Sequence, residues 1–220
     1  SFDTGHSSNS ISAGVGYVKA REITGQHYNV VSVIGDGALT GGMAYEALNN
    51  AAMLKSNFVI VLNDNEMSIS KSIGGMADYL SEIRTSNHYN DLKDDVSSAL
   101  KNIPVVGEKL VEKIKKTKNS LKQLFIPGML FENMGITYLG PIDGHNIRQL
   151  IKNLRDAKRV PGPVIVHVIT EKGKGYAPAF NNPAKFHGVS PFDVKTGKTL
   201  EKHELTYADA FSEAMCDLAG

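Results

Sequence analysis

The sequence predicts an α/β domain built on a doubly wound parallel sheet with helices on both faces. Three apolar runs have the length of buried strands, at residues 30–34, 58–62 and 164–169. Segments with helical spacing of apolar residues separate these runs. Because parallel strands are joined by crossovers that usually contain a helix, this alternation predicts a parallel sheet rather than an antiparallel one.

The first predicted helix covers residues 10–23, ahead of the first strand. Asn9 or Ser10 could cap its N-terminus, and Gly25 could end it. The apolar residues expected near one of its faces are Ile11, Val15, Val18 and Ile23.

The rest of the chain repeats the alternation of strands and helices. A helix at 40–54 leads to the second strand, and a polar loop is expected at 68–86, with Gly74-Gly75 inside it. The other expected elements are helices at 91–102, 108–125 and 146–158, a strand at 136–139, a turn at 141–145, an extended stretch at 172–198 and a helix at 206–218.

Composition excludes several broad functions. The 220 residues are enough for one α/β domain with its own core. The formal net charge is +1, which indicates no polyanion-binding role. The lysines of 108–125 fit a solvated helix face, because no aromatic residues interleave with them. No apolar run reaches the length of a membrane span. Cys216 is the only cysteine, which excludes a disulfide within the chain.

The most informative motif is a pair of triplets, Gly35-Asp36-Gly37 and Asn63-Asp64-Asn65. Each follows an apolar run, so both are expected at the carboxyl ends of parallel strands, where open sheets bind ligands. Asp36 and Asn65 offer hard oxygen ligands that suit Mg²⁺, which also keeps phosphate oxygens and water in its shell. Small residues beside Asp36 let a diphosphate approach the backbone. The pair therefore predicts a magnesium–diphosphate site.

Two other interpretations of these triplets remain open. Residues 35–41 superficially resemble a dinucleotide fingerprint, with Asp64 as the ribose-binding acid of a non-catalytic Rossmann-type module. Asp36 between glycines would repel a pyrophosphate unless a cation bridges the two, which favours the metal. Alternatively, Asp36 and Asn65 only end turns. A P-loop is excluded, because the sequence contains no Gly-x-x-x-x-Gly-Lys-Ser/Thr.

With the other motifs of the chain, the triplets resemble the thiamine diphosphate signature, and more narrowly the 1-deoxy-D-xylulose-5-phosphate synthases. The Asp-Gly-His element also occurs in transketolases, and the match is weak at 86–125 and 201–220. The matching blocks are 5–8 (GHSS), 35–50 (GDGALTGGMAYEALNN), 63–70 (NDNEMSIS), 127–128 (PG), 140–145 (GPIDGH), 171–178 (EKGKGYAP) and 186–187 (FH).

This resemblance implies a transferase that uses thiamine diphosphate and Mg²⁺. The implied reaction is the decarboxylative condensation of pyruvate with glyceraldehyde 3-phosphate, the first step of the non-mevalonate isoprenoid pathway. A transketolase or the E1 component of a 2-oxoacid dehydrogenase is the alternative within the same class. No nucleic acid or membrane partner is implied. The full-length enzyme is expected to be a homodimer in the bacterial cytoplasm, or in the plastid stroma if the source is a plant.

The resemblance also implies which residues form the cofactor site. The expected magnesium ligands are Asp36, Asn65 and the backbone carbonyl of Met67. A helix beginning near Thr40 would point its N-terminal dipole at the diphosphate. For residues 5–7, a helix-cap role is the alternative that the residues alone leave open. The residues expected to bind the cofactor are Gly5, His6, Ser7, Gly37, Ala38, Asn65, Lys172 and Tyr176.

His187 is the expected catalytic residue, because the resemblance places it over the reacting carbon. Imidazole titrates near neutrality and can move a proton to or from a carbonyl intermediate. The residues alone would favour an exposed loop histidine. Lys172 could face the diphosphate or substrate, and an ordinary surface lysine is the alternative. His145 is expected to be a packing element of its turn, and the histidines without a motif are His27, His88, His167 and His203.

Residues 1–198 are expected to form the diphosphate- and magnesium-binding domain, with a peripheral helical insert at 86–125 and an extended linker at 172–198. Residues 199–220 would begin a second, pyrimidine-binding domain that is truncated. In the family that the chain resembles, the glutamate that activates the cofactor belongs to the second domain. The chain is therefore expected to be inactive alone.

Overall fold

The computed structural model describes residues 3–67, 72–85, 129–200 and 205–219. The helices and the peripheral insert predicted between 86 and 125 lie outside these residues, as do His88 and His203. The chain divides into two compact units, Ser1–Glu171 and Lys172–Gly220. No helix within the described ranges is long and apolar enough to cross a membrane.

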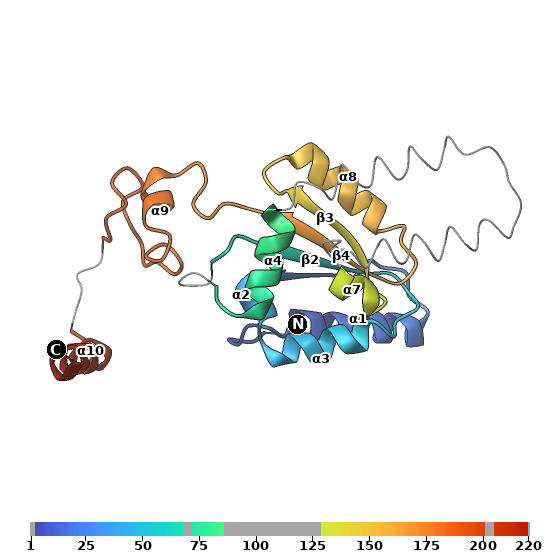
Figure 1. Ribbon diagram of the computed structural model, residues 1–220, viewed down its shortest axis with the longest axis horizontal. Helices are drawn as coiled ribbons and strands as arrows, with labels where there is room; N and C mark the ends of the chain where they lie inside the picture. Colours follow the sequence, from blue (N-terminus) through green and yellow to red (C-terminus); the bar gives the residue numbers. More distant parts are fainter. Residues whose placement is uncertain (1–2, 68–71, 86–128, 201–204, 220) are drawn as a thin grey trace, which may run out of the picture. The chain divides into compact units, whose positions relative to one another are not determined.

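A four-stranded parallel sheet forms the centre of the first unit (Figure 1). Its strands lie in the order β1 (Val31–Gly35), β2 (Phe58–Asp64), β4 (Pro163–Ile169) and β3 (Thr137–Asp143). All three strand pairs are parallel, and the register places Val31 opposite Val59 and Phe58 opposite Pro163. The predicted parallel α/β fold is therefore confirmed.

Helices cover both faces of this sheet, as predicted. The first face packs against α1 (Ser10–Thr24), α3 (Gly42–Ala51), α4 (Gly75–Thr85) and α7 (Met129–Asn133). The second face packs against α8 (Ile147–Ala157), which contacts β3 and β4 (Figure 1). The side chain of Asn146 caps α8 by accepting a hydrogen bond from the Gln149 N–H at 3.1 Å.

The central strands are mostly apolar because they contribute to a core on each face. In β2, Phe58, Ile60 and Leu62 belong to the core under α1 and α3. Val59, which lies between them in sequence, belongs to the core under α8. Successive side chains of a strand point to opposite faces, so a strand covered on both sides reads as a continuous apolar run.

The first helix follows its prediction closely, with two differences. α1 ends at Gly25, whose φ of 65° is the left-handed conformation that glycine adopts readily. Asn9 occupies the N-cap position, but its side chain donates to Thr4 and His6 instead of capping. Ile23 is 85% exposed. It lies five residues beyond buried Val18, which is roughly 140° around the helix at 3.6 residues per turn.

The helix predicted at 40–54 is α3, which begins close to the predicted start, and a short helix that was not predicted precedes it. A four-residue helix, α2 (Asp36–Leu39), begins directly after β1, and α3 begins at Gly42. Between them the backbone is extended at Gly41, where an added Cβ would lie 2.4 Å from Ser8 Oγ. The break therefore brings the chain close against the N-terminal segment.

Two further elements differ from the prediction. Most of the polar loop expected at 68–86 is helix α4, because Leu80 and Ile83 are spaced for one helix face and are buried in the core. Strand β3 extends beyond the expected turn start and reaches Asp143, with a cis peptide at Gly140–Pro141 and a register shift there.

The second unit contains α9 (Ala177–Asn181) within the stretch expected to be extended, and α10 (Tyr207–Ala219) close to the predicted final helix. Three aromatic rings pack together in it, with centroids 5.3 Å apart for Phe186 and Phe192 and 5.7 Å apart for Tyr176 and Phe186. A loop between Phe192 and Thr199, which pair as an isolated bridge, closes this cluster.

Candidate functional site

The two triplets meet at the carboxyl edge of the sheet. β1 ends at Gly35 and β2 at Asp64, so Asp36 and Asn65 each follow the last residue of a strand. These strands are neighbours, with Gly35 opposite Asn63. The Asn65 N–H donates to Asp36 Oδ1 at 3.4 Å. The structure therefore brings together the two residues that the sequence singled out as cation ligands.

Asp36 is buried, and the part of the chain that the structure describes gives it no positively charged partner. Its residue is 4% exposed, and among the described residues it forms no ion pair. Its second oxygen, Oδ2, accepts a hydrogen bond from Ser72 Oγ at 3.0 Å. Buried charges in proteins are normally paired or coordinate a metal, so we expect a cation beside this carboxylate.

The oxygen donors near Asp36 suit a hard cation. Asn65 adds a carboxamide oxygen, and the chain turns after it so that the Met67 N–H donates to Asn65 Oδ1 at 3.0 Å. In the described part of the chain, no three His, Cys, Asp or Glu side chains gather in a metal-binding group. A cation at Asp36 would therefore need amide, backbone and non-protein oxygens, which is how Mg²⁺ is commonly held beside phosphates.

Asp64 has a different role from its neighbours in the triplet. It is fully buried, and it pairs with Arg84 through Oδ1 at 2.5 Å and with His167 through Oδ2 at 3.0 Å. Burial opposes the charged form of Asp64, but hydrogen bonds from His167 and Arg84 and the Arg84 charge outweigh it. The pKa of Asp64 is consequently below its usual value. Since both oxygens are engaged, Asp64 is not placed to bind a ribose.

His167 extends this buried network across the sheet. Its Nδ1 lies 2.6 Å from the Tyr138 hydroxyl, and both residues are buried. Because the Asp64 carboxylate can only accept, His167 Nε2 carries the hydrogen in this contact, and a neutral ring then accepts from Tyr138 at Nδ1. The sequence offered one signal for this pair: His167 interrupts the apolar run of β4, and a buried polar side chain needs a partner.

The N-terminal segment is fastened to the glycine-rich turn. Gly5, His6 and Ser7 are exposed, and Ser8 Oγ next to them donates to the Ala38 carbonyl at 2.7 Å. This bond ties the segment to α2, which contains Gly37 and Ala38. His145, by contrast, uses its ring to accept the Glu171 N–H at 2.9 Å, which agrees with a packing role.

A small cavity of about 80 Å³ opens beside the carboxyl-edge residues. Asp36 and Ser72 line it together with residues from α4, among them Arg84. Arg84 was not predicted as a site residue, because the segment that forms α4 was expected to be a loop.

The second unit holds the other three predicted residues. Lys172 Nζ lies 3.0 Å from His187 Nδ1, so two side chains far apart in sequence meet. The Tyr176 hydroxyl donates to the Val194 carbonyl at 2.9 Å, while its ring packs on Phe186. Lys172 and Tyr176 are partly buried, and His187 is exposed.

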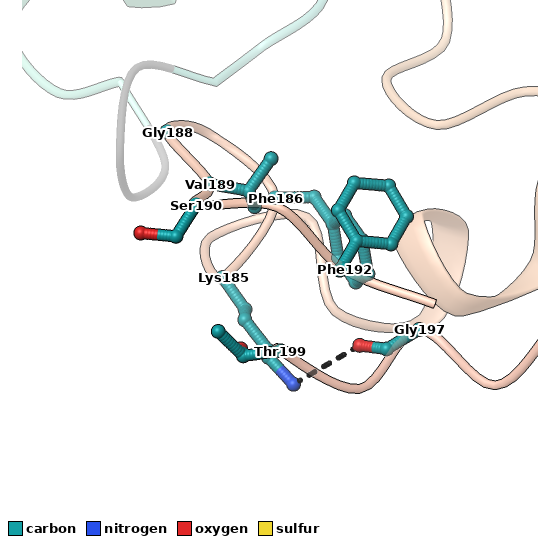
Figure 2. Close-up of a pocket in the computed structure, with 8 residues that line it drawn as sticks. All are labelled: Lys185, Phe186, Gly188, Val189, Ser190, Phe192, Gly197 and Thr199. Atoms are coloured by element: carbon teal, nitrogen blue, oxygen red, sulfur yellow. Dashed lines mark hydrogen bonds between the residues drawn. The ribbon is translucent and has the colours of Figure 1, made fainter. Parts of the chain in front are cut away.

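A larger cavity of about 250 Å³ lies in the same unit, beside the aromatic cluster (Figure 2). Lys185 crosses it, and its Nζ donates to the Gly197 carbonyl at 3.4 Å. Phe186, Phe192 and Thr199 are among the other residues that line it. None of the predicted site residues contributes to this lining.

The fold and the site together define a parallel α/β domain whose carboxyl edge presents oxygen donors for a hard cation. Comparison with known proteins places the chain more narrowly. The family model described as 1-deoxy-D-xylulose-5-phosphate synthase matches residues 1–170. The chain belongs to the 1-deoxy-D-xylulose-5-phosphate synthase family.

Individual relatives carry the same description. A 1-deoxy-D-xylulose-5-phosphate synthase from Lachnoclostridium phytofermentans is 58% identical over 99% of this chain. Another from Desulforudis audaxviator is 54% identical over the same share. The chain spans about 35% of the length of these relatives. Among solved structures, a transketolase from Campylobacter jejuni is 20% identical over 80% of this chain and 21% of its own, with a TM-score of 0.49.

Proposed function

We propose that the protein carrying this chain is a 1-deoxy-D-xylulose-5-phosphate synthase. It would condense pyruvate with glyceraldehyde 3-phosphate and release CO₂. Family membership supports this proposal. Enzymes of this family use thiamine diphosphate with a divalent metal ion, usually Mg²⁺. Bound thiamine diphosphate supplies the electron sink for decarboxylation, and the protein supplies binding, orientation and proton transfer.

The observation that carries the proposal is the buried carboxylate of Asp36, which has no positively charged partner among the described residues. Mg²⁺ would balance its charge and link it to the diphosphate. Asn65 and the Met67 carbonyl would complete the protein ligands, because both lie on the turn that contacts Asp36. Gly37 and Ala38 would lie against the diphosphate. Gly5, His6 and Ser7 would line the cofactor next to them, which the bond from Ser8 to Ala38 supports.

In the second unit, His187 would move protons at the reacting carbon. Its contact with Lys172 supports this role, because an ammonium group beside the ring provides a neighbouring donor. Lys172 and Tyr176 would contact the cofactor or substrate. Tyr176 is held by its hydroxyl and by the aromatic cluster, so its ring has a fixed orientation.

The remaining parts of the proposal concern the whole protein. We place the diphosphate-binding domain at 1–198 and the start of a pyrimidine-binding domain at 199–220. The full-length enzyme would be a cytoplasmic homodimer. The bacterial relatives support the cellular setting, and the lone Cys216 agrees with a reducing compartment.

Calorimetry on the full-length protein tests the metal assignment. Wild type should bind thiamine diphosphate in a Mg²⁺-dependent manner and should not bind NAD. Asp36→Asn keeps the shape of the side chain and removes its charge, so it should weaken cofactor binding in Mg²⁺ by at least about tenfold. The matched control is Asp143→Asn, which removes an exposed carboxylate at the end of β3.

Thermal unfolding of the metal-free proteins makes the test sharper. Without metal, Asp36→Asn should not lower the melting temperature, because it removes a buried carboxylate for which the described residues supply no positively charged partner. A loss of binding together with early unfolding would instead point to a folding defect. Unchanged binding in Asp36→Asn would contradict the assignment of Asp36 as a ligand.

A further inference from the structure

The turn between the two proposed ligands has an unusual backbone. Glu66 lies between Asn65 and Met67 and has a φ of 61°. Residues with a Cβ rarely adopt this left-handed conformation, and they keep it only where the surroundings hold them. The side chain of Glu66 is 49% exposed, so packing around it does not account for the conformation.

Arg84 contacts both sides of this turn. It comes from the last turn of α4, and its side chain is 18% exposed. One terminal nitrogen, NH2, donates to Asp64 Oδ1 at 2.5 Å, and the other, NH1, pairs with the Glu66 carboxylate. The same Asp64 oxygen accepts the Glu66 N–H at 3.2 Å. The Arg84 guanidinium group thus connects Asp64 to Glu66. The first residue precedes the two proposed ligands, and the second lies between them.

The Asp64 end of this connection is held by several contacts. Asp64 is fully buried, its Oδ2 pairs with His167, and its backbone carbonyl accepts the Thr170 N–H at 2.8 Å. The Arg84 end is fixed because Arg84 belongs to α4, whose Leu80 and Ile83 are buried in the core. Arg84 therefore links two well-packed elements across the turn.

We propose that Arg84 is a positioning residue, which holds Glu66 in its left-handed conformation and so keeps Asn65 and Met67 in place for the cation. This inference rests on the proposed magnesium site. It requires the forked guanidinium, because a lysine presents a single charged nitrogen that cannot pair with two carboxylates in the same geometry.

Amide hydrogen exchange on the metal-free, full-length protein tests the effect on the turn directly. In Arg84→Gln, the amides of Glu66 and Met67 should exchange faster than in wild type. The amides of β4 should exchange at the wild-type rate, because that strand is held by its neighbours. A general loss of stability would accelerate both groups. Unchanged exchange at Glu66 and Met67 would overturn the proposal.

Calorimetry at saturating thiamine diphosphate then measures the apparent Mg²⁺ affinity. Arg84→Gln should lower it by about tenfold or more, as for other groups that support metal ligands, and Arg84→Lys should recover only part of the loss. Arg159→Gln is the control, because Arg159 is 81% exposed and pairs with Asp156 at 3.9 Å. Its Mg²⁺ affinity should equal that of wild type.

Glu66→Gly separates positioning from general stabilisation. Glycine adopts a positive φ without strain, so the turn should depend less on Arg84. The loss of Mg²⁺ affinity caused by Arg84→Gln should be smaller in the Glu66→Gly background than in wild type. Equal losses in the two backgrounds would overturn the proposal.

The two proposals fail in different ways. If wild type shows no Mg²⁺-dependent cofactor binding, the proposed function is wrong, and hydrogen exchange still decides whether Arg84 holds the turn. If wild type binds and Arg84→Gln binds Mg²⁺ equally well, the positioning role is wrong and the proposed function stands.

Discussion

Asp36 and His167 are both polar and buried, but the sequence indicated a role for the first and no partner for the second. Asp36 lies between two glycines at the end of an apolar run, and this local pattern marks a ligand-binding turn. His167 is held by Tyr138 and Asp64, which lie on two other strands. No local pattern contains such a contact, because it depends on the order of the strands in the sheet.

The difference between local patterns and tertiary contacts also explains which other residues of the candidate site could be predicted from the sequence. It placed Asp36 and Asn65 together, because both follow strands that are neighbours. It did not find Arg84, whose contact with Asp64 depends on the packing of α4, or Ser72, which contacts Asp36 from the segment before that helix. Chemistry at the ends of strands is therefore predictable, while the side chains that support it are not.

His187 carries the residue-scale prediction on catalysis. In the full-length enzyme, His187→Ala should lower kcat by about 10²–10⁴-fold, the usual range for loss of a proton-transfer group. Its affinity for thiamine diphosphate should stay near that of wild type, because the proposed role is at the reacting carbon. Release of CO₂ from pyruvate with glyceraldehyde 3-phosphate measures the first quantity, and calorimetry measures the second.

The control for His187 is His27→Ala, which removes an exposed histidine that belongs to no motif. It should leave both kcat and cofactor affinity unchanged. Wild-type kcat in His187→Ala would return His187 to the alternative of an ordinary loop histidine.

Strands were predicted better than helices at the scale of elements. The runs at 58–62 and 164–169 are buried on both faces, so their apolar composition alone predicts that they are strands. α4 escaped prediction because its sequence is polar, begins at a glycine and buries only Leu80 and Ile83. Its helical form depends on the core that these two side chains join, which is tertiary information.

The two glycines of α1 give a matched test of how this helix packs. A Cβ at Gly14 would lie 2.3 Å from Ser32 Oγ and 2.4 Å from Phe58 Cζ, whereas a Cβ at Gly16 meets nothing within 4 Å. Gly14→Ala should therefore destabilise the protein by about 1–3 kcal/mol through overpacking. Gly16→Ala should stabilise it by roughly 0.5–1 kcal/mol, because alanine is the better helix former.

Denaturant unfolding of both variants measures these changes in the free energy of unfolding. The opposite signs matter more than the sizes, because helix propensity alone would make both substitutions stabilising. Stabilisation by Gly14→Ala would show that α1 does not approach β1 and β2 as closely as the structure indicates.

At the scale of the whole molecule, the described helices cover the two faces of the sheet unequally. Among the described residues, α1, α2, α3, α4 and α7 contribute to the core on the first face, whereas α8 on the second face contacts β3 and β4. Val31 and Val33 of β1 point to that second face and are 52% and 61% exposed. β1 is also an edge strand of the sheet in the described part of the chain. Exposed apolar side chains on an edge strand favour association with another surface.

The 220-residue chain studied alone should therefore self-associate as its concentration rises, and Val33→Lys should weaken this association. A buried valine contributes about 1.5–3 kcal/mol, so the apparent dissociation constant should rise roughly tenfold or more. Lysine also places like charges against each other in any symmetric contact through β1. Sedimentation velocity over a concentration series measures the effect.

The control is Val194→Lys, which changes a valine that is 70% exposed in the other unit and should leave association unchanged. Equal association of wild type and Val33→Lys would show that the exposed face of β1 is not the contact.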